Sequence, residues 1–276
     1  MNRSAMKLAG RVRTRRSADG SLTASTTLSC VEVVAMTAES IARSAGSADD
    51  RLELSDGEVH FLWRFIQGSI MDPETRERLR RAWGMCTRHA AALLAVEAAY
   101  RHGWMHACAL LYLDLIERAL GALTTTRGLF GEDRAIRRLH ATGPCLICEM
   151  EIEASGGGAA SADLLDRSPD PSQLSSLADD TRSHWMALVC RLCSPGAIGP
   201  LCRLHLVGDP HLDAREEIHA QRATLGYVAR HLIRYARSSR WEHRDTETPE
   251  DRAALLEAVG WCSGWSSLLA IIGAPE

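Results

Sequence analysis

Hydrophobic residues recur at intervals of three and four positions along most of the chain, the spacing that places side chains on one face of a helix. The clearest run, within residues 58–68, consists of Val59, Leu62, Phe65 and Ile66. Similar runs cover residues 30–45, 90–100, 104–123, 212–238 and 250–271. The pattern predicts an all-α protein.

A helix-start signal and the composition support this prediction. Asp72 is a favourable N-cap and Pro73 suits a first helical turn, so we predict a helix from there through Trp83. Hydrophobic residues make up 46% of the 276 positions but aromatic residues only 5%, so the core must consist mainly of aliphatic side chains. Ala and Leu favour helices, whereas strand-forming aromatic residues are few.

Charge and hydropathy exclude several functional classes. The net charge of −3 provides no global basic field, which argues against a nucleic-acid partner. The 32 basic residues include a single lysine, Lys7, so the arginine content reflects a compositional bias more than phosphate binding. No apolar run reaches 18 residues and the N-terminus lacks a signal-peptide core, so we expect no membrane span and a cytoplasmic location. A protein partner is compatible with the sequence, but neither partner nor substrate can be named.

Two segments have the composition of unstructured chain. Residues 1–26 carry six basic residues against the single acid Asp19, followed by a Ser/Thr-rich stretch, and predict a disordered basic tail. Residues 154–180 are rich in Gly, Ser, Ala, Asp and Pro, which predicts a flexible surface insertion. We do not expect a domain boundary there, because candidate metal ligands lie on both sides.

Three landmarks recur at nearly the same interval. Cys86 and Cys202, each of which begins a Cys-x2-His motif, are 116 residues apart, whereas Cys30 and Cys145 are 115 apart. Tyr112 and its counterpart 115 residues later both lie within long helical patterns. We therefore predict a pseudo-symmetric helical bundle of two repeats, residues 27–140 and 141–276.

Nine cysteines in a reducing compartment, four of them in Cys-x2-Cys pairs, indicate metal binding and not disulfides. Two short knuckles, each Cys-x2-Cys or Cys-x2-His, can supply the four ligands of a tetrahedral zinc ion. The repeat favours a site built from Cys145, Cys148, Cys202 and His205. The alternative is a compact site in which Cys190 and Cys193 pair with Cys202 and His205.

The first repeat lacks one ligand. Cys30 is followed by Val33 where a second cysteine would stand, which leaves Cys30, Cys86 and His89 as three ligands with an open fourth position. Catalytic zinc sites keep such an opening for water or substrate, although a structural site that has lost a ligand has the same composition. Under the favoured pairing, Cys190 and Cys193 are extra ligands or redox thiols.

The chain resembles an uncharacterised prokaryotic family with repeated CPxC…GxCxxH helical units. The matching stretches are GPCLICEMEI (143–152), GMCTRHAAALL (84–94), GPLCRLHL (199–206) and the C-terminal ARHLIRYARSSRWEH. The resemblance implies a helical metal-binding fold and no particular activity. The chain departs from the family pattern at Val33 and in the additional Cys190/Cys193 pair.

Three functions fit the sequence. The favoured hypothesis is a zinc-binding helical protein in which the metal is structural and the protein acts as a binding or adaptor module. The second is a metal-dependent enzyme with an open Cys/His site in the first repeat. The third is an iron–sulfur or thiol redox sensor, since thiolates also hold iron–sulfur clusters.

Overall fold

Two helices, α4 (Thr87–Tyr100) and α13 (Pro249–Ser263), are buried on nearly every side and form the centre of the structure. This computed structural model describes residues 52–124, 131–150, 152, 158, 160–209 and 213–273, which belong to one compact unit, Ala48–Glu276. In chain order the other elements are α2 (Asp56–Gln67), η1 (Ser69–Met71), α3 (Pro73–Ala82), α5 (His106–Thr124), α6 (Gly131–Arg137), α7 (Leu146–Glu149), α8 (Ala162–Arg167), α9 (Ser172–Asp180), α10 (Arg182–Trp185), η2 (Met186–Leu188), α11 (Arg203–Gly208), α12 (Ala214–Arg237), η3 (Trp241–His243) and α14 (Ser266–Ile272). The predicted all-α fold is confirmed for these residues.

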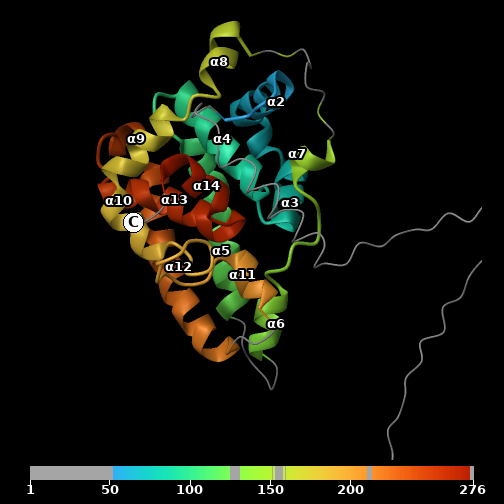
Figure 1. Cartoon of the computed structure of the whole chain (residues 1–276), viewed down its shortest axis with the longest axis vertical. Coiled ribbons are helices and arrows are strands. Elements are labelled where there is room, and N and C mark those ends of the chain that lie inside the picture. The colour runs from blue at the N-terminus through green and yellow to red at the C-terminus, as the bar shows by residue number, and fades with distance from the viewer. Residues whose placement is uncertain are drawn as a thin grey trace, which may run out of the picture. The chain divides into compact units, whose positions relative to one another are not determined.

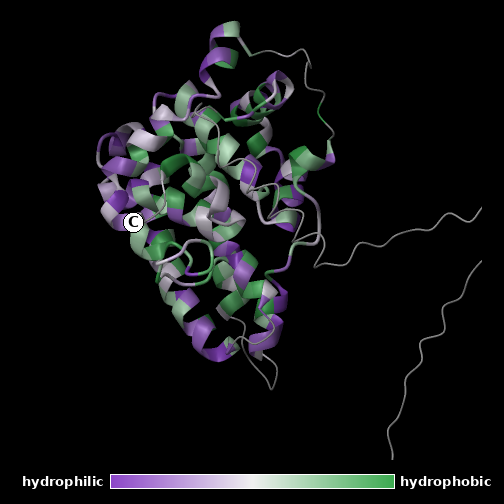
Figure 2. Ribbon diagram, in the orientation of Figure 1, coloured by the Kyte–Doolittle hydropathy of each residue, from purple (hydrophilic) through white to green (hydrophobic). Residues whose placement is uncertain are grey.

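The central position of α4 and α13 follows from their composition. Every residue of α4 from His89 to Ala99 is buried, and so is every residue of α13 from Ala253 to Ser263. A helix that is apolar all round has no face for water and must lie inside the protein. Figure 2 shows the hydrophobic colouring gathered on these inner helices.

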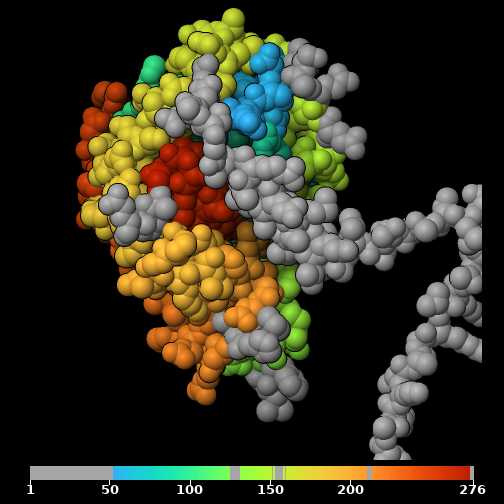
Figure 3. All heavy atoms as spheres, in the orientation of Figure 1, coloured from blue at the N-terminus to red at the C-terminus, as the bar shows by residue number. Residues whose placement is uncertain are grey.

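Other helices cover the two central ones. The helices α5 and α12 pack against each other and against α13, whereas α2, α9 and α14 pack against α4 (Figure 1). In the space-filling view, the C-terminal segment is seen between α9 and the segment of residues 186–205 (Figure 3). The core is therefore assembled from helices that are distant in sequence.

Local signals set several helix ends. The predicted start at Asp72 is confirmed, because its side chain accepts a hydrogen bond from the Thr75 backbone N–H and Pro73 opens α3. The single helix predicted over residues 250–271 is instead two helices, α13 and α14. Gly264 separates them with φ 88° and ψ 155°, a conformation that residues with a side chain rarely adopt.

The segment predicted to be a flexible insertion differs from expectation. Its second half forms α8 and α9, and Leu164, Leu174 and Leu177 are buried there. Leu174 and Leu177 stand at helical spacing, but the polar composition of the segment as a whole concealed this signal. The predicted basic tail of residues 1–26 lies outside the described residues, and the predicted repeat boundary at 140/141 falls inside the compact unit. Among the described helices, none combines the length and apolar character needed to cross a membrane.

Two buried glutamates on the central helices have opposite surroundings. The carboxylate of Glu97 accepts 2.8 Å hydrogen bonds from the backbone N–H groups of Ala107 and Cys108, at the start of α5. That arrangement provides acceptors for backbone N–H groups at the helix N-terminus that have no partner within the helix. In contrast, both carboxyl oxygens of Glu257 on α13 are buried and have no hydrogen-bond partner among the described residues, and burial raises the pKa of Glu257 to about 8.

We expect Glu257→Gln to stabilise the protein at neutral and alkaline pH. Because the folded-state pKa lies above the usual 4.5, wild-type stability falls as pH rises through the window between these two values. The difference between variant and wild type should grow across that window and reach roughly 3 kcal/mol at pH 7. Urea unfolding at pH 5, 7 and 8.5 measures it.

The control is Glu77→Gln, which removes an exposed carboxylate from α3. It should unfold like the wild type at all three pH values. Equal midpoints for Glu257→Gln and wild type at pH 8.5 would show that the Glu257 carboxylate is stabilised by a partner in the folded protein.

Candidate metal centres

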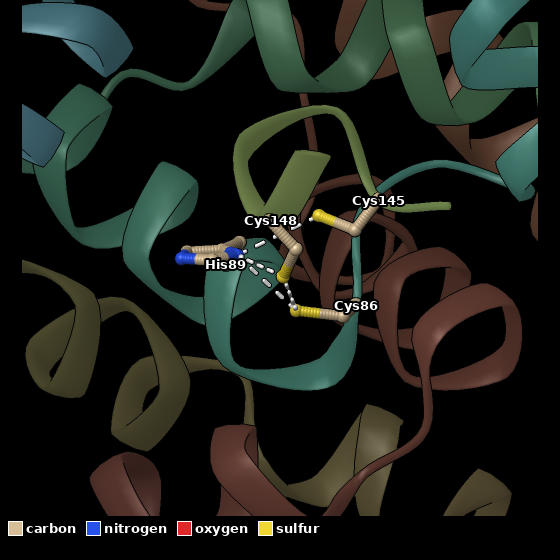
Figure 4. A group of neighbouring side chains, drawn as sticks. All are labelled: Cys86, His89, Cys145 and Cys148. Atoms are coloured by element: carbon tan, nitrogen blue, oxygen red, sulfur yellow. Dashed lines mark hydrogen bonds between the residues drawn. The ribbon is translucent and has the colours of Figure 1, made fainter. Parts of the chain in front are cut away.

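The first group of candidate ligands joins two knuckles from different parts of the chain. Cys86 is the N-cap residue of α4 and His89 lies in its first turn, whereas Cys145 and Cys148 belong to α7 and its N-cap. Figure 4 shows the four side chains pointing toward one another. The Nδ1 atom of His89 lies 3.3 Å from the sulfurs of Cys86 and Cys148 and 3.5 Å from that of Cys145, and the Cys86 and Cys148 sulfurs are 3.8 Å apart.

The second group is built from neighbouring knuckles. Cys190 and Cys193 face Cys202, the N-cap residue of α11, and His205 in its first turn. The Nδ1 atom of His205 lies 3.3 Å from the sulfurs of Cys190 and Cys202 and 3.4 Å from that of Cys193. The Cys193 and Cys202 sulfurs are 3.7 Å apart.

These distances match the edges of a tetrahedron around one metal ion. With zinc–sulfur bonds of about 2.3 Å and zinc–nitrogen bonds of about 2.05 Å, the edges are about 3.8 Å between sulfurs and about 3.6 Å between sulfur and nitrogen. In each group the four donor atoms lie within 4.8 Å of one another. Each group thus offers three sulfurs and one imidazole nitrogen, arranged for a single tetrahedral ion.

The sulfurs of the first group lie close together, and for this reason their pKa values differ. A hydrogen bond from Cys86 lowers the pKa of Cys145 to about 3, whereas the same interaction raises the pKa of Cys86 well above its ordinary value. Burial raises the pKa of Cys148, and the charge of Cys145 adds to this effect. The protein groups alone thus favour one thiolate, and a dication is the natural way to ionise all three.

The pKa values in the second group are shifted for the same reason. Hydrogen bonds from Cys193 and Cys202 lower the pKa of Cys190, whereas hydrogen bonding to Cys190 is the main reason that the pKa of Cys202 is raised. Hydrogen bonds to Cys190 and Cys193 raise the pKa of His205 to about 10. A bound cation would replace these protons as the positive charge between the sulfurs.

Glu58 orients the histidine of the first group. Its carboxylate lies 3.0 Å from Nε2 of His89, the ring nitrogen that faces away from the sulfurs. Burial alone would raise the pKa of Glu58, but hydrogen bonds from Arg88, the Ser55 backbone and His89 outweigh it and lower the pKa to about 2. The ionised carboxylate is placed to accept a hydrogen from Nε2, and this tautomer leaves Nδ1 free to bind metal.

Residues of α12 and α13 support the second group from outside. Glu217 accepts a 3.0 Å hydrogen bond from Arg191, which lies between Cys190 and Cys193. Gln221 donates to the Leu201 carbonyl at 2.7 Å and accepts from the Trp261 indole at 2.6 Å. The loops that carry the cysteines are thus connected directly to the helical core.

Both Cys-x2-His knuckles are anchored to the last turn of α13. The Thr87 hydroxyl, next to Cys86, donates to the Ser263 carbonyl at 2.7 Å, and Arg203, next to Cys202, donates to the Cys262 carbonyl at 2.8 Å. Gly264 follows directly, and a Cβ atom there would lie 2.8 Å from Leu204 and 3.5 Å from the Thr87 hydroxyl. The two groups therefore share one anchor, at a position that requires glycine.

The structure corrects the favoured ligand pairing. Cys145 and Cys148 are not placed with Cys202 and His205 but with Cys86 and His89. The alternative pairing, in which Cys190 and Cys193 join Cys202 and His205, is the one observed. The physical reason is that a Cys-x2-Cys knuckle can complete a four-ligand set with any Cys-x2-His knuckle, so the ligand types do not decide the pairing. The packing of α7 against α3 decides it, because it places Cys145 and Cys148 at the start of α4.

The expected three-ligand site is corrected as well. Cys86 and His89 do not stand with an open fourth position, because Cys145 and Cys148 complete a set of four. Cys30 and Val33 lie outside the described residues. Glu58 could not be identified from the sequence as a partner of His89. Ser55 and Glu58 form a recognisable capping box, but no sequence signal connects Glu58 with a histidine 31 positions later.

We expect Gly264→Ala to lower the free energy of unfolding by about 1–3 kcal/mol, because alanine is strained at this φ and ψ and its Cβ would contact Leu204. Thermal unfolding of the purified protein measures the effect. Gly226→Ala is the matched control, since Gly226 lies inside α12 and a Cβ there meets only Arg230 at 3.8 Å. Alanine at 226 should be neutral or stabilising, and an equal loss at both positions would contradict the prediction.

We expect Glu58→Gln to weaken zinc binding at the first group by roughly 10–100-fold, because the ionised partner of His89 is lost. Glutamine retains the capping box, so folding should be preserved. Competition with a chromogenic chelator measures both affinities, and that of the second group should not change. Glu74→Gln, an exposed change on α3, is the control; equal first-group affinities in Glu58→Gln and wild type would refute the role of Glu58.

Comparison with known proteins adds no assignment: no family model matches the chain, and no curated protein or solved structure gives a significant match. The site geometry therefore stands as the main basis for function.

Proposed function

We propose that this protein is a zinc-stabilised helical binding module in which both Cys3His groups hold structural zinc. The observation that carries the proposal is the donor geometry, since two separate groups each present four donor atoms at the edge lengths of a zinc tetrahedron. The coarser conclusion, a helical protein with two Cys/His groups able to hold metal, follows directly from the structure.

The closed ligand sets support a structural role for the metal. Catalytic zinc has three protein ligands and an open position, whereas structural zinc has four. Each group has four. Two cavities in the described part of the chain are lined by none of the eight candidate ligands. This arrangement weighs against the hypothesis of a metal-dependent enzyme.

The same distances weigh against an iron–sulfur cluster. In a cluster the protein ligands are divided between two or more iron atoms, and the inorganic core keeps the ligands of different irons apart. Here all four donors of each group lie within 4.8 Å of one another, which suits one ion. The histidine in each group also favours zinc. Thiol redox chemistry remains the alternative that best fits an exposed ligand, and Cys148 is exposed.

The shared placement of the two Cys-x2-His knuckles supports the proposed internal repeat. Both cysteines are N-cap residues and both histidines lie one turn later, so the helix N-terminus favours the thiolate in each case. The order of the knuckles differs, because Cys-x2-His comes first in one group and second in the other. We propose that a unit was duplicated and that its Cys-x2-His knuckle then came to pair with a different Cys-x2-Cys knuckle, in agreement with the resemblance to the repeated-motif family. We also propose that the protein works in a reducing compartment.

We expect purified protein to contain about two zinc ions per chain and to be colourless. Cys148→Ser and Cys193→Ser should each reduce the content to about one, because each removes a ligand from a different group. Elemental analysis of protein purified without added metal gives the stoichiometry. Substitution with cobalt(II) should give the intense visible bands of a tetrahedral thiolate site.

Cys108→Ala is the matched control, since Cys108 is a buried cysteine outside both groups. It should retain about two zinc ions. Bound iron with broad visible absorbance would refute the zinc proposal, and so would protein that folds identically with no metal bound.

A further inference from the structure

A cavity of about 270 Å³ lies next to the first Cys/His group. Its walls are mainly apolar: Phe61 and Phe65 of α2 line one part, and Leu146 and Met150 of the α7 region line another. Ligand pockets are typically concave and mostly apolar with a few polar groups, and this volume lies just below their usual range of about 300–1,000 Å³. The cavity therefore suits a small, mainly apolar molecule.

Two arginines give the cavity a positive side. Arg64 and Arg78 both line it. Arg78 is paired with the half-exposed Glu149 at 2.5 Å, whereas Arg64 has no carboxylate within ion-pair distance among the described residues. A guanidinium group next to an apolar surface favours a ligand with a carboxylate at one end, since it can bind both carboxylate oxygens.

The first metal group fixes one wall of this cavity. Leu146 and Met150 flank Cys148: Leu146 is the first residue of α7, a helix of four residues, and Met150 is its C-cap. So short a helix has no stability of its own in water. Its position depends on the burial of Leu146 and Ile147 and, with zinc bound as proposed above, would also depend on ligation by Cys145 and Cys148. Loss of that ion would release the wall that faces Phe61 and Phe65.

We propose that this cavity binds a small apolar monocarboxylate, with the carboxylate at Arg64 and Arg78 and the apolar body between the α2 and α7 walls, and that binding requires metal in the first group. The second part rests on the proposed function. The occupant is a small molecule because the cavity is confined to a few side chains. It is an anion because Arg64 is positively charged and meets no carboxylate within ion-pair distance in the described part of the chain.

The test is calorimetric titration of octanoate into the full-length zinc-loaded protein. We expect saturable binding at one site per chain, and at least tenfold weaker binding in the double variant Arg64→Ala/Arg78→Ala. Met150→Glu should abolish binding, because it places a negative charge in the cavity wall. Arg138→Ala, an exposed arginine elsewhere, is the matched control and should bind octanoate like the wild type.

Octylamine, which carries the opposite charge on the same apolar chain, should bind at least tenfold more weakly than octanoate. Equal binding of the two compounds would overturn the assignment of an anion site. Undiminished octanoate binding by the double arginine variant, with its zinc content and unfolding midpoint unchanged, would overturn the proposed location. No binding of octanoate to the zinc-loaded wild type would overturn the proposal outright.

Two variants separate this proposal from that of structural zinc. Cys148→Ser should lose one zinc ion and octanoate binding together, whereas Cys193→Ser should lose one zinc ion and retain octanoate binding. Octanoate binding by metal-depleted wild type or by Cys148→Ser would refute the coupling and leave the zinc sites intact. Zinc content is measured on every sample, so failure of the metal proposal is detected independently of octanoate.

Discussion

The last turn of α13 connects the helical core with both candidate metal centres. The final carbonyls of a helix have no partner within it, and here two consecutive ones, of Cys262 and Ser263, accept hydrogen bonds from Arg203 and Thr87. Each donor stands next to the cysteine that caps a ligand-bearing helix. Gly264 then turns the chain with φ 88°, which leaves room for both helices. Core packing and ligand placement therefore depend on the same few atoms.

The second constraint is electrostatic. Three sulfurs that converge within each group cannot all ionise next to one another without a compensating charge, and this is why hydrogen bonding lowers the pKa of Cys145 while it raises that of Cys86. A dication removes the conflict and ties metal binding to folding. The helix N-termini at Cys86 and Cys202 contribute partial positive charge, but far less than an ion does.

Much of the fold could be predicted from the sequence, because most signals for it are local. Helical periodicity and the helix start at Asp72–Pro73 can be recognised from residues that are neighbours in the sequence. The break at Gly264 could not be predicted, since its cause is the approach of Leu204 and Thr87 from other helices. The ligand types were equally visible, but their pairing was not: Cys145 and Cys148 fit either Cys-x2-His knuckle chemically, and tertiary packing decides between them. The role of Glu58 could not be predicted either, because its contact with His89 is also a tertiary one.

The two groups differ in how much chain they enclose, and this separates their roles. The second group spans the 16 residues from Cys190 to His205, whereas the first spans the 63 residues from Cys86 to Cys148. Closing the longer loop costs about 1 kcal/mol more chain entropy. The second group can therefore form locally, while the first needs α3 and α4 already in place. The first also includes the exposed Cys148, so a metal ion bound there would be the one that solvent reaches more easily. Loss of that metal would loosen α7 and the cavity wall, whereas α13, with its anchor for the second group, would retain its packing.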